Sequence, residues 1–171
     1  MDMTRQMEEK LRYVLWTADP AEEAEPVKPA VYAGQEAQIC HMEERSRQGC
    51  PRLIVVRGAG GCGRRTLMRR AAARLRKPLI CADMEMLYQC CLENGNAVFG
   101  VLSRMLAEKR PMFCLIAGRK EDDEGRWGEL LYGLINEGIS CYVVTDRSIA
   151  LPREGSYEQA EIRLRPPDIA Q

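Results

Sequence analysis

Residues 57–66 read Arg-Gly-Ala-Gly-Gly-Cys-Gly-Arg-Arg-Thr and directly follow the apolar run Leu-Ile-Val-Val at 53–56. An apolar strand, a glycine-rich turn and a helix in this order are typical of a phosphate-binding loop, and Gly58 and Gly63 have the spacing of G-x-x-x-x-G-K-[ST]. Glycine allows positive φ, so backbone N–H groups can close around an anion, and the N-terminus of the following helix adds unpaired donors and a positive dipole end. The alternative is a glycine-rich turn that binds nothing.

The side chains of this loop depart from the pattern at two positions. Arg64 stands in the place of the lysine, and Arg65 stands in the place of the hydroxyl that binds Mg²⁺. A guanidinium still binds phosphate oxygens, but Arg65 does not coordinate a metal. Thr66 offers a hydroxyl one residue later, which is rotated by roughly 100° on a helix. The candidate phosphate-binding residues are Gly58, Ala59, Gly60, Gly61, Cys62, Gly63, Arg64, Arg65 and Thr66.

Composition indicates an ordinary globular domain in a reducing compartment, which we expect to be cytoplasmic. The chain has 171 residues, of which 46% are hydrophobic, and its 25 basic residues balance its 25 acidic residues. No apolar run reaches membrane-spanning length, and no signal peptide is expected. Three of the eight cysteines, Cys81, Cys114 and Cys141, lie in apolar runs typical of buried strands. No C-x-x-C motif is present, so we expect no metal site.

Hydrophobic periodicity predicts alternating helices and strands. Residues 1–33 are expected to form an N-terminal helical extension at 8–16 and a linker rich in proline and acidic residues; 34–171 are expected to form the main domain. In that domain we expect five strands, at 53–56, 78–82, 112–117, 140–144 and 160–164. We expect helices at 35–48, 67–75, 98–107 and 127–136. Short apolar strands that alternate with amphipathic helices predict an α/β fold, with a parallel sheet flanked by helices.

The order of these segments resembles the nucleotide-binding subdomain of AAA+ ATPases. The resemblance covers 35–168 and rests on GAGGCGRRT, KPLICADM, PMFCLIAG, SCYVVTDR and AEIRLRPPD in that sequence. It implies a P-loop NTPase fold with a five-stranded parallel sheet in the order 5-1-4-3-2. It also implies ATP or ADP at the carboxyl ends of the central strands, and further protein subunits or domains in a larger assembly.

Besides the metal-binding hydroxyl, two features of the AAA+ family are missing or displaced in this sequence. The Walker B acids should follow the third strand, where this chain has Ala117 and Gly118, while a group of acids comes later, at 121–124. Thr145 matches the position of the polar sensor residue, although a threonine at a strand end is also ordinary. The helical lid should begin after Asp168, and the sequence given ends at Gln171.

These departures predict a module that binds ATP or ADP with little or no hydrolysis, and with no firm site for Mg²⁺. We therefore expect nucleotide affinity that is largely independent of Mg²⁺, and no ATPase activity of the chain alone. One alternative is a structural or protein-interaction module that binds no nucleotide. A less favoured alternative is nucleic-acid binding by the basic helix at 64–77, which carries seven basic residues and no acid.

Overall fold

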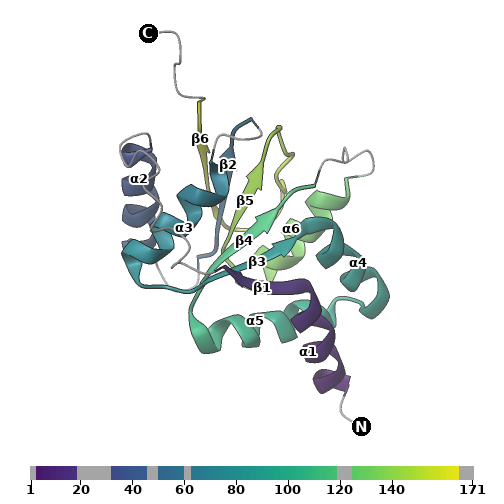
Figure 1. The fold of residues 1–171 in the computed structure, drawn as a ribbon. Coiled ribbons are helices and arrows are strands. Elements are labelled where there is room, and N and C mark those ends of the chain that lie inside the picture. The colour runs from purple at the N-terminus through teal and green to yellow at the C-terminus, as the bar shows by residue number, and fades with distance from the viewer. Residues whose placement is uncertain (1–2, 19–31, 46–49, 60–62, 119–124, 166–171) are drawn as a thin grey trace.

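A computed structural model describes residues 3–18, 32–45, 50–59, 63–118 and 125–165 (Figure 1). Its centre is a six-stranded sheet in the order β1-β3-β4-β5-β2-β6. Every neighbouring pair is parallel except β1 and β3, which are antiparallel. The strands are β1 (Leu15–Ala18), β2 (Arg52–Arg57), β3 (Leu79–Asp83), β4 (Met112–Ile116), β5 (Cys141–Thr145) and β6 (Glu158–Arg163).

Helices cover both faces of the sheet, as Figure 1 shows. The helices are α1 (Met3–Val14), α2 (Ala33–Glu44), α3 (Arg64–Leu75), α4 (Met84–Asn94), α5 (Ala97–Lys109) and α6 (Arg126–Asn136). One hydrophobic core lies between the sheet and α1, α4, α5 and α6, and a second lies between the sheet and α2 and α3. Successive strand residues point to opposite faces, so Leu53 enters the first core and Ile54 the second.

The α/β class, with a mostly parallel sheet flanked by helices, is confirmed, but the strand number and the complete order differ from the expectation. Five strands are expected in one parallel sheet, and the structure has six. The difference lies in β1, which joins the edge beside β3. The sequence pattern places 8–16 in one helix, whereas α1 ends at Val14 and the chain continues as a strand. Trp16 and Thr17 favour extended backbone, and pairing with β3 supplies hydrogen bonds that a short helical end lacks.

Helix α4 has no counterpart in the sequence-based prediction. Asp83 caps its N-terminus, because the Asp83 Oδ1 atom accepts a hydrogen bond of 3.1 Å from the Met86 N–H. The buried residues of this helix are Met84, Leu87 and Cys90, a sparse set that gives a weak periodic signal. Most of the expected linker at 19–33, namely residues 19–31, lies outside the described residues.

The helices that the structure describes include none that is long and apolar enough to span a lipid bilayer.

Candidate functional site

The glycine-rich loop begins at the carboxyl end of β2, which lies between β5 and β6. Gly58 is buried, and its N–H donates a hydrogen bond of 3.0 Å to the carbonyl oxygen of Thr145 at the end of β5. Ala59 is exposed, while Gly60, Gly61 and Cys62 lie outside the described residues. The start of the loop is therefore held against the neighbouring strand at the edge where parallel α/β sheets bind ligands.

Gly63 closes the described part of the loop with a left-handed backbone conformation, φ 87°. Only glycine adopts this conformation without strain, so the turn into α3 depends on it. The Gly63 carbonyl oxygen accepts the N–H of Leu67 at 2.9 Å, which starts the helical hydrogen-bond pattern. The first N–H groups of α3 have no partner within the helix and are available to an anion.

The first turn of α3 contains no acidic residue, and it begins with Arg64, Arg65 and Thr66. Arg64 and Thr66 are half-buried, and Arg65 is exposed. Positive side chains at a helix N-terminus oppose the helix dipole, which makes this turn costly unless an anion is near. The arrangement therefore favours a negatively charged ligand.

Arg64 lies close enough to Asp146, directly after β5, to affect its ionisation. The pKa of Asp146 is lowered mainly by its hydrogen bond with Arg147. Burial opposes this effect, and the charges of Arg147 and Arg64 lower the pKa by smaller amounts. Arg147 Nε and Asp146 Oδ1 are 3.1 Å apart. Asp146 thus places a negative charge close to the first turn of α3.

Arg65 lies toward β3 and β4, where two cysteine thiols face each other on neighbouring strands. A hydrogen bond with Cys114 lowers the pKa of Cys81, with smaller contributions from Arg69 and Arg65 and an opposing effect of burial. The same hydrogen bond, together with burial, raises the pKa of Cys114. Arg65 therefore acts on β3 and β4, whereas Arg64 acts on the end of β5, and Arg65 brings positive charge to the position of the expected metal ligand.

Thr145, the candidate sensor, is 1% exposed. Its Oγ1 atom accepts the N–H of Arg147 at 3.1 Å and donates to the Arg147 carbonyl oxygen at 3.1 Å. The hydroxyl is thus engaged in the turn that follows β5, while the Thr145 carbonyl binds Gly58. In this state Thr145 positions the loop through its backbone.

The end of β4 carries no carboxylate, since Ile116, Ala117 and Gly118 follow one another there. On the neighbouring strand β3, Asp83 pairs in register with Ile116 and uses its side chain to cap α4. The acids at 121–124 lie outside the described residues. The described part of the chain contains no group of three or more metal-ligating side chains placed to hold a metal ion.

Tyr32 is a site residue that the sequence did not reveal. A Cβ atom added to Gly63 would lie 3.6 Å from Tyr32 Cε2, and the Tyr32 hydroxyl donates to the Arg165 carbonyl oxygen at 3.2 Å. The ring therefore connects the start of α2, the loop and the chain after β6. The only sequence signal was an aromatic residue at the end of a segment rich in proline and acids.

Much of the basic face of α3 is neutralised by α2. Arg70 and Arg74 both pair with Glu36, at 3.0 and 3.5 Å, and Lys77 pairs with Glu43 at 2.9 Å. These acids come from α2, which precedes β2 in the chain and packs directly on α3. Part of the positive charge at 64–77 is therefore paired with acids of this chain and does not require nucleic acid as a partner.

Comparisons with known proteins give structural neighbours only: no protein-family model and no curated protein matches the sequence. Trip13 from Rhizobiales is 15% identical with a TM-score of 0.53, over 88% of this chain and 68% of that chain. A chain of the E. coli MS115-1 HORMA:CdnC:Trip13 complex is 11% identical with a TM-score of 0.54, over 90% and 69%. The fold is of the AAA+ type.

A structure that concerns katanin self-assembly is similar in the same way. Its sequence is 12% identical with a TM-score of 0.50, and the match covers 82% of this chain but 52% of that chain. At such identities the likeness shows the fold alone. The chemistry of the loop depends on this chain's own residues.

Proposed function

We propose that this chain is an AAA+-like module that binds ATP or ADP and hydrolyses it slowly or not at all. The observation that carries the proposal is the start of α3, where a left-handed Gly63 leads into a helical turn with two arginines and no acid. Backbone N–H groups at a helix N-terminus bind phosphate without help from a lysine. Arg64 supplies the side-chain contact to phosphate oxygens.

The ring of Tyr32 supports a nucleotide rather than a free phosphate. It lies beside Gly63, at the edge of the loop, and is half-buried. Nucleobases stack on aromatic side chains because every base has a π-face. A phosphate on the N-terminus of α3 and a base near Tyr32 would use both features of the site.

We expect weak hydrolysis because the described site lacks groups that phosphoryl transfer requires. Catalysis of this reaction depends on positioned metal ions and on a residue that orients the attacking water. Arg65 replaces the metal-binding hydroxyl, and the end of β4 offers no carboxylate. Each 1.36 kcal/mol lost from transition-state stabilisation slows the reaction about tenfold, so the loss of several groups leaves little turnover.

The second candidate is a protein-interaction module that binds no nucleotide. The neighbours include a complex with HORMA and CdnC and a structure that concerns self-assembly. By analogy we propose that this chain also works with protein partners, either as a subunit or as a domain of a larger assembly. Nucleotide binding distinguishes the two candidates directly.

The test is a titration of the chain with a fluorescent ADP derivative. We expect saturable binding, weakened roughly ten- to a hundredfold by Arg64→Ala, because a hydrogen bond to a charged group contributes about 1.5–3 kcal/mol. Arg104→Ala is the matched control: Arg104 is exposed on α5, on the opposite face of the sheet. Equal affinity of both variants, or no binding at all, would contradict the proposal.

The same proteins incubated with ATP and Mg²⁺ test the second part of the proposal. We expect no phosphate release above the buffer rate. Turnover that disappears in Arg64→Ala would show that Arg64 replaces the lysine in catalysis, and the claim of weak hydrolysis would be wrong. Turnover that Arg64→Ala leaves unchanged would point to a contaminating ATPase.

A further inference from the structure

The two edge strands of the sheet differ in the charge of their side chains. At one edge, β6 carries Glu158, Glu161 and Arg163, and two of these charges pair with the neighbouring strand: Glu158 with Arg52 at 3.1 Å and Glu161 with Arg57 at 3.9 Å. Charged side chains on an edge strand discourage pairing with another chain. The charges on β6 therefore disfavour pairing of this edge with a strand of another chain.

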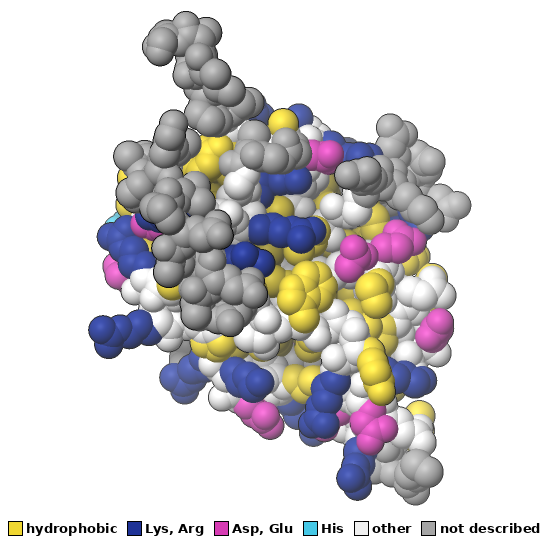
Figure 2. Space-filling view, viewed as in Figure 1, with side chains coloured by type: hydrophobic (Ala, Val, Ile, Leu, Met, Phe, Trp, Pro, Cys, Tyr) yellow, Lys and Arg dark blue, Asp and Glu magenta, His cyan; other side chains and the backbone are white. Residues whose placement is uncertain are grey.

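The opposite edge strand, β1, has the sequence Leu-Trp-Thr-Ala, with no charge and no proline. It pairs with β3 on one side, and no described strand pairs with its other side. Trp16 is 42% exposed and Tyr13, two residues before the strand, is 88% exposed. Figure 2 shows exposed hydrophobic side chains near the middle of the face that carries β1. An uncharged edge of this kind presents backbone donors and acceptors to a further strand.

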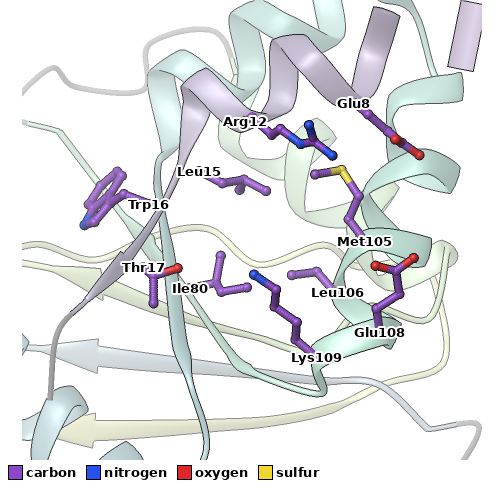
Figure 3. A pocket seen from close by; sticks show the side chains of 10 residues that line it. All are labelled: Glu8, Arg12, Leu15, Trp16, Thr17, Ile80, Met105, Leu106, Glu108 and Lys109. Atoms are coloured by element: carbon purple, nitrogen blue, oxygen red, sulfur yellow. The ribbon is translucent and has the colours of Figure 1, made fainter. Parts of the chain in front are cut away.

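A cavity of about 300 Å³ lies beside β1, between this strand, α1 and α5 (Figure 3). Apolar side chains of Leu15, Ile80, Met105 and Leu106 line it. Charged side chains of both signs surround them: Glu8 and Arg12 on α1, and Glu108 and Lys109 on α5. The hollow thus offers apolar surface next to the unpaired strand, within a rim that carries two acids and two bases.

We propose that a second copy of this chain pairs with β1, so that two sheets join edge to edge about a two-fold axis. The charges of the rim favour this occupant. A strongly acidic or strongly basic partner would meet like charges, whereas a rim with equal numbers of both signs is complementary to its own copy. In such an antiparallel pair the end of β1 next to Glu8 and Arg12 in one copy lies beside the end of β1 next to Glu108 and Lys109 in the other (Figure 3).

Symmetry and side-chain direction select the register of the pairing. Leu15 and Thr17 lie opposite Ala82 and Ile80 of β3, which face the first core, whereas Trp16 lies opposite Cys81, which faces the second. Residues that lie opposite each other in an antiparallel pair share a face. With the axis beside Trp16, each Trp16 lies opposite Trp16 of the second copy, and Leu15 lies opposite Thr17. This register also forms a cross-strand aromatic pair, which stabilises antiparallel sheets.

Light scattering after size exclusion, from micromolar to submillimolar concentration, tests the pairing with the full chain. We expect a mass of twice 19.4 kDa at high concentration. Trp16→Lys and Trp16→Glu each bring like charges together at the axis, and each is expected to weaken dimerisation roughly thirtyfold or more, since a central tryptophan is a typical hot spot. An equimolar mixture of the two variants is expected to restore the dimer, because opposite charges then meet.

Two further variants separate pairing from folding. Trp16→Phe keeps an aromatic side chain at the axis and is expected to dimerise. Gln159→Lys adds a charge to β6, where Gln159 is exposed, and is expected to leave the dimer intact. Circular dichroism checks that every variant has the secondary structure of the parent chain. The proposal is overturned by a monomer at all concentrations, by a dimer that Trp16→Lys retains or Gln159→Lys abolishes, or by folded variants that do not dimerise when mixed.

Discussion

Arg64 and Asp146 place opposite charges near each other, beside the loop that we assign to phosphate. The charge of Arg64 contributes to the lowered pKa of Asp146, so Asp146 is ionised at neutral pH. An arriving phosphate gains the attraction of Arg64 but meets the repulsion of Asp146. The carboxylate of Asp146 thus offers Arg64 part of the charge interaction that a phosphate would offer.

Asp146→Asn is therefore expected to strengthen nucleotide binding. It removes the repulsive charge, so we expect roughly threefold tighter ADP binding, as is typical of one exposed charge pair. Equilibrium titration with the fluorescent ADP derivative measures the change. Glu93→Gln removes an exposed acid at the far end of α4 and should have no effect. Weaker binding by Asp146→Asn would place the phosphate elsewhere.

Burial of Cys141 makes the free energy of unfolding depend on pH in the alkaline range. It is 1% exposed in the first core, and burial raises its pKa from 9.0 to about 12. Between these pH values the unfolded state loses the thiol proton while the folded state keeps it, so the free energy of unfolding falls as pH rises. One such thiol contributes a slope of about 1.4 kcal/mol per pH unit.

Urea unfolding of the parent chain and Cys141→Ala at several pH values between 9.0 and 12 measures this contribution. The variant is expected to be less stable at neutral pH, because a buried atom is lost. Above pH 9 its free energy of unfolding should fall less steeply with pH than that of the parent. Parallel curves would show that Cys141 ionises equally in both states.

At the scale of elements, helix α6 packs against α5 through a glycine. A Cβ atom at Gly133 would overlap the Phe99 ring, which is itself 7% exposed, so the two helices approach more closely there than any residue with a side chain would allow. Gly128 lies in the same helix, and a Cβ atom there would meet nothing within 4 Å. The packing of α6 therefore requires a glycine at position 133 but not at position 128.

Gly133→Ala is expected to lower the free energy of unfolding by about 1–3 kcal/mol, because a methyl group must displace a buried ring. Gly128→Ala is the matched control and should raise it by up to about 1 kcal/mol, since alanine favours a helix more than glycine. Urea unfolding at one temperature compares the three proteins. If both alanine variants were stabilised alike, the Phe99 ring would have room to move and the close packing would be wrong.

The elements that the sequence predicts well have long, regular patterns. The helix expected at 127–136 corresponds to α6, whose buried residues repeat every three or four positions, and the five predicted strands correspond to β2 to β6 within a few residues. Strand β1 was missed because four residues after an amphipathic helix continue its pattern. Its strand conformation depends on β3, which lies more than sixty residues later.

At the scale of the whole molecule, the parallel strands bring distant segments to one edge. Gly58 at the end of β2 contacts Thr145 at the end of β5, and Arg64 lies near Asp146. The loop and its arginines were readable from the sequence because they are contiguous. The parts played by Asp146 and Tyr32 were not, since they depend on which strands are neighbours and on where the chain before α2 packs.

A thermal-shift titration with ATP and ADP, each with and without Mg²⁺, tests the central claim most directly. A ligand that binds only the folded chain must raise its unfolding temperature. We expect both nucleotides to raise it, and Mg²⁺ to change the affinity little, because Arg64 and Arg65 neutralise phosphate charge and the described residues at the end of β4 offer no metal ligand. No shift with either nucleotide would contradict nucleotide binding and favour a protein-interaction module. A large gain of ATP affinity with Mg²⁺ would show that the site holds a metal after all.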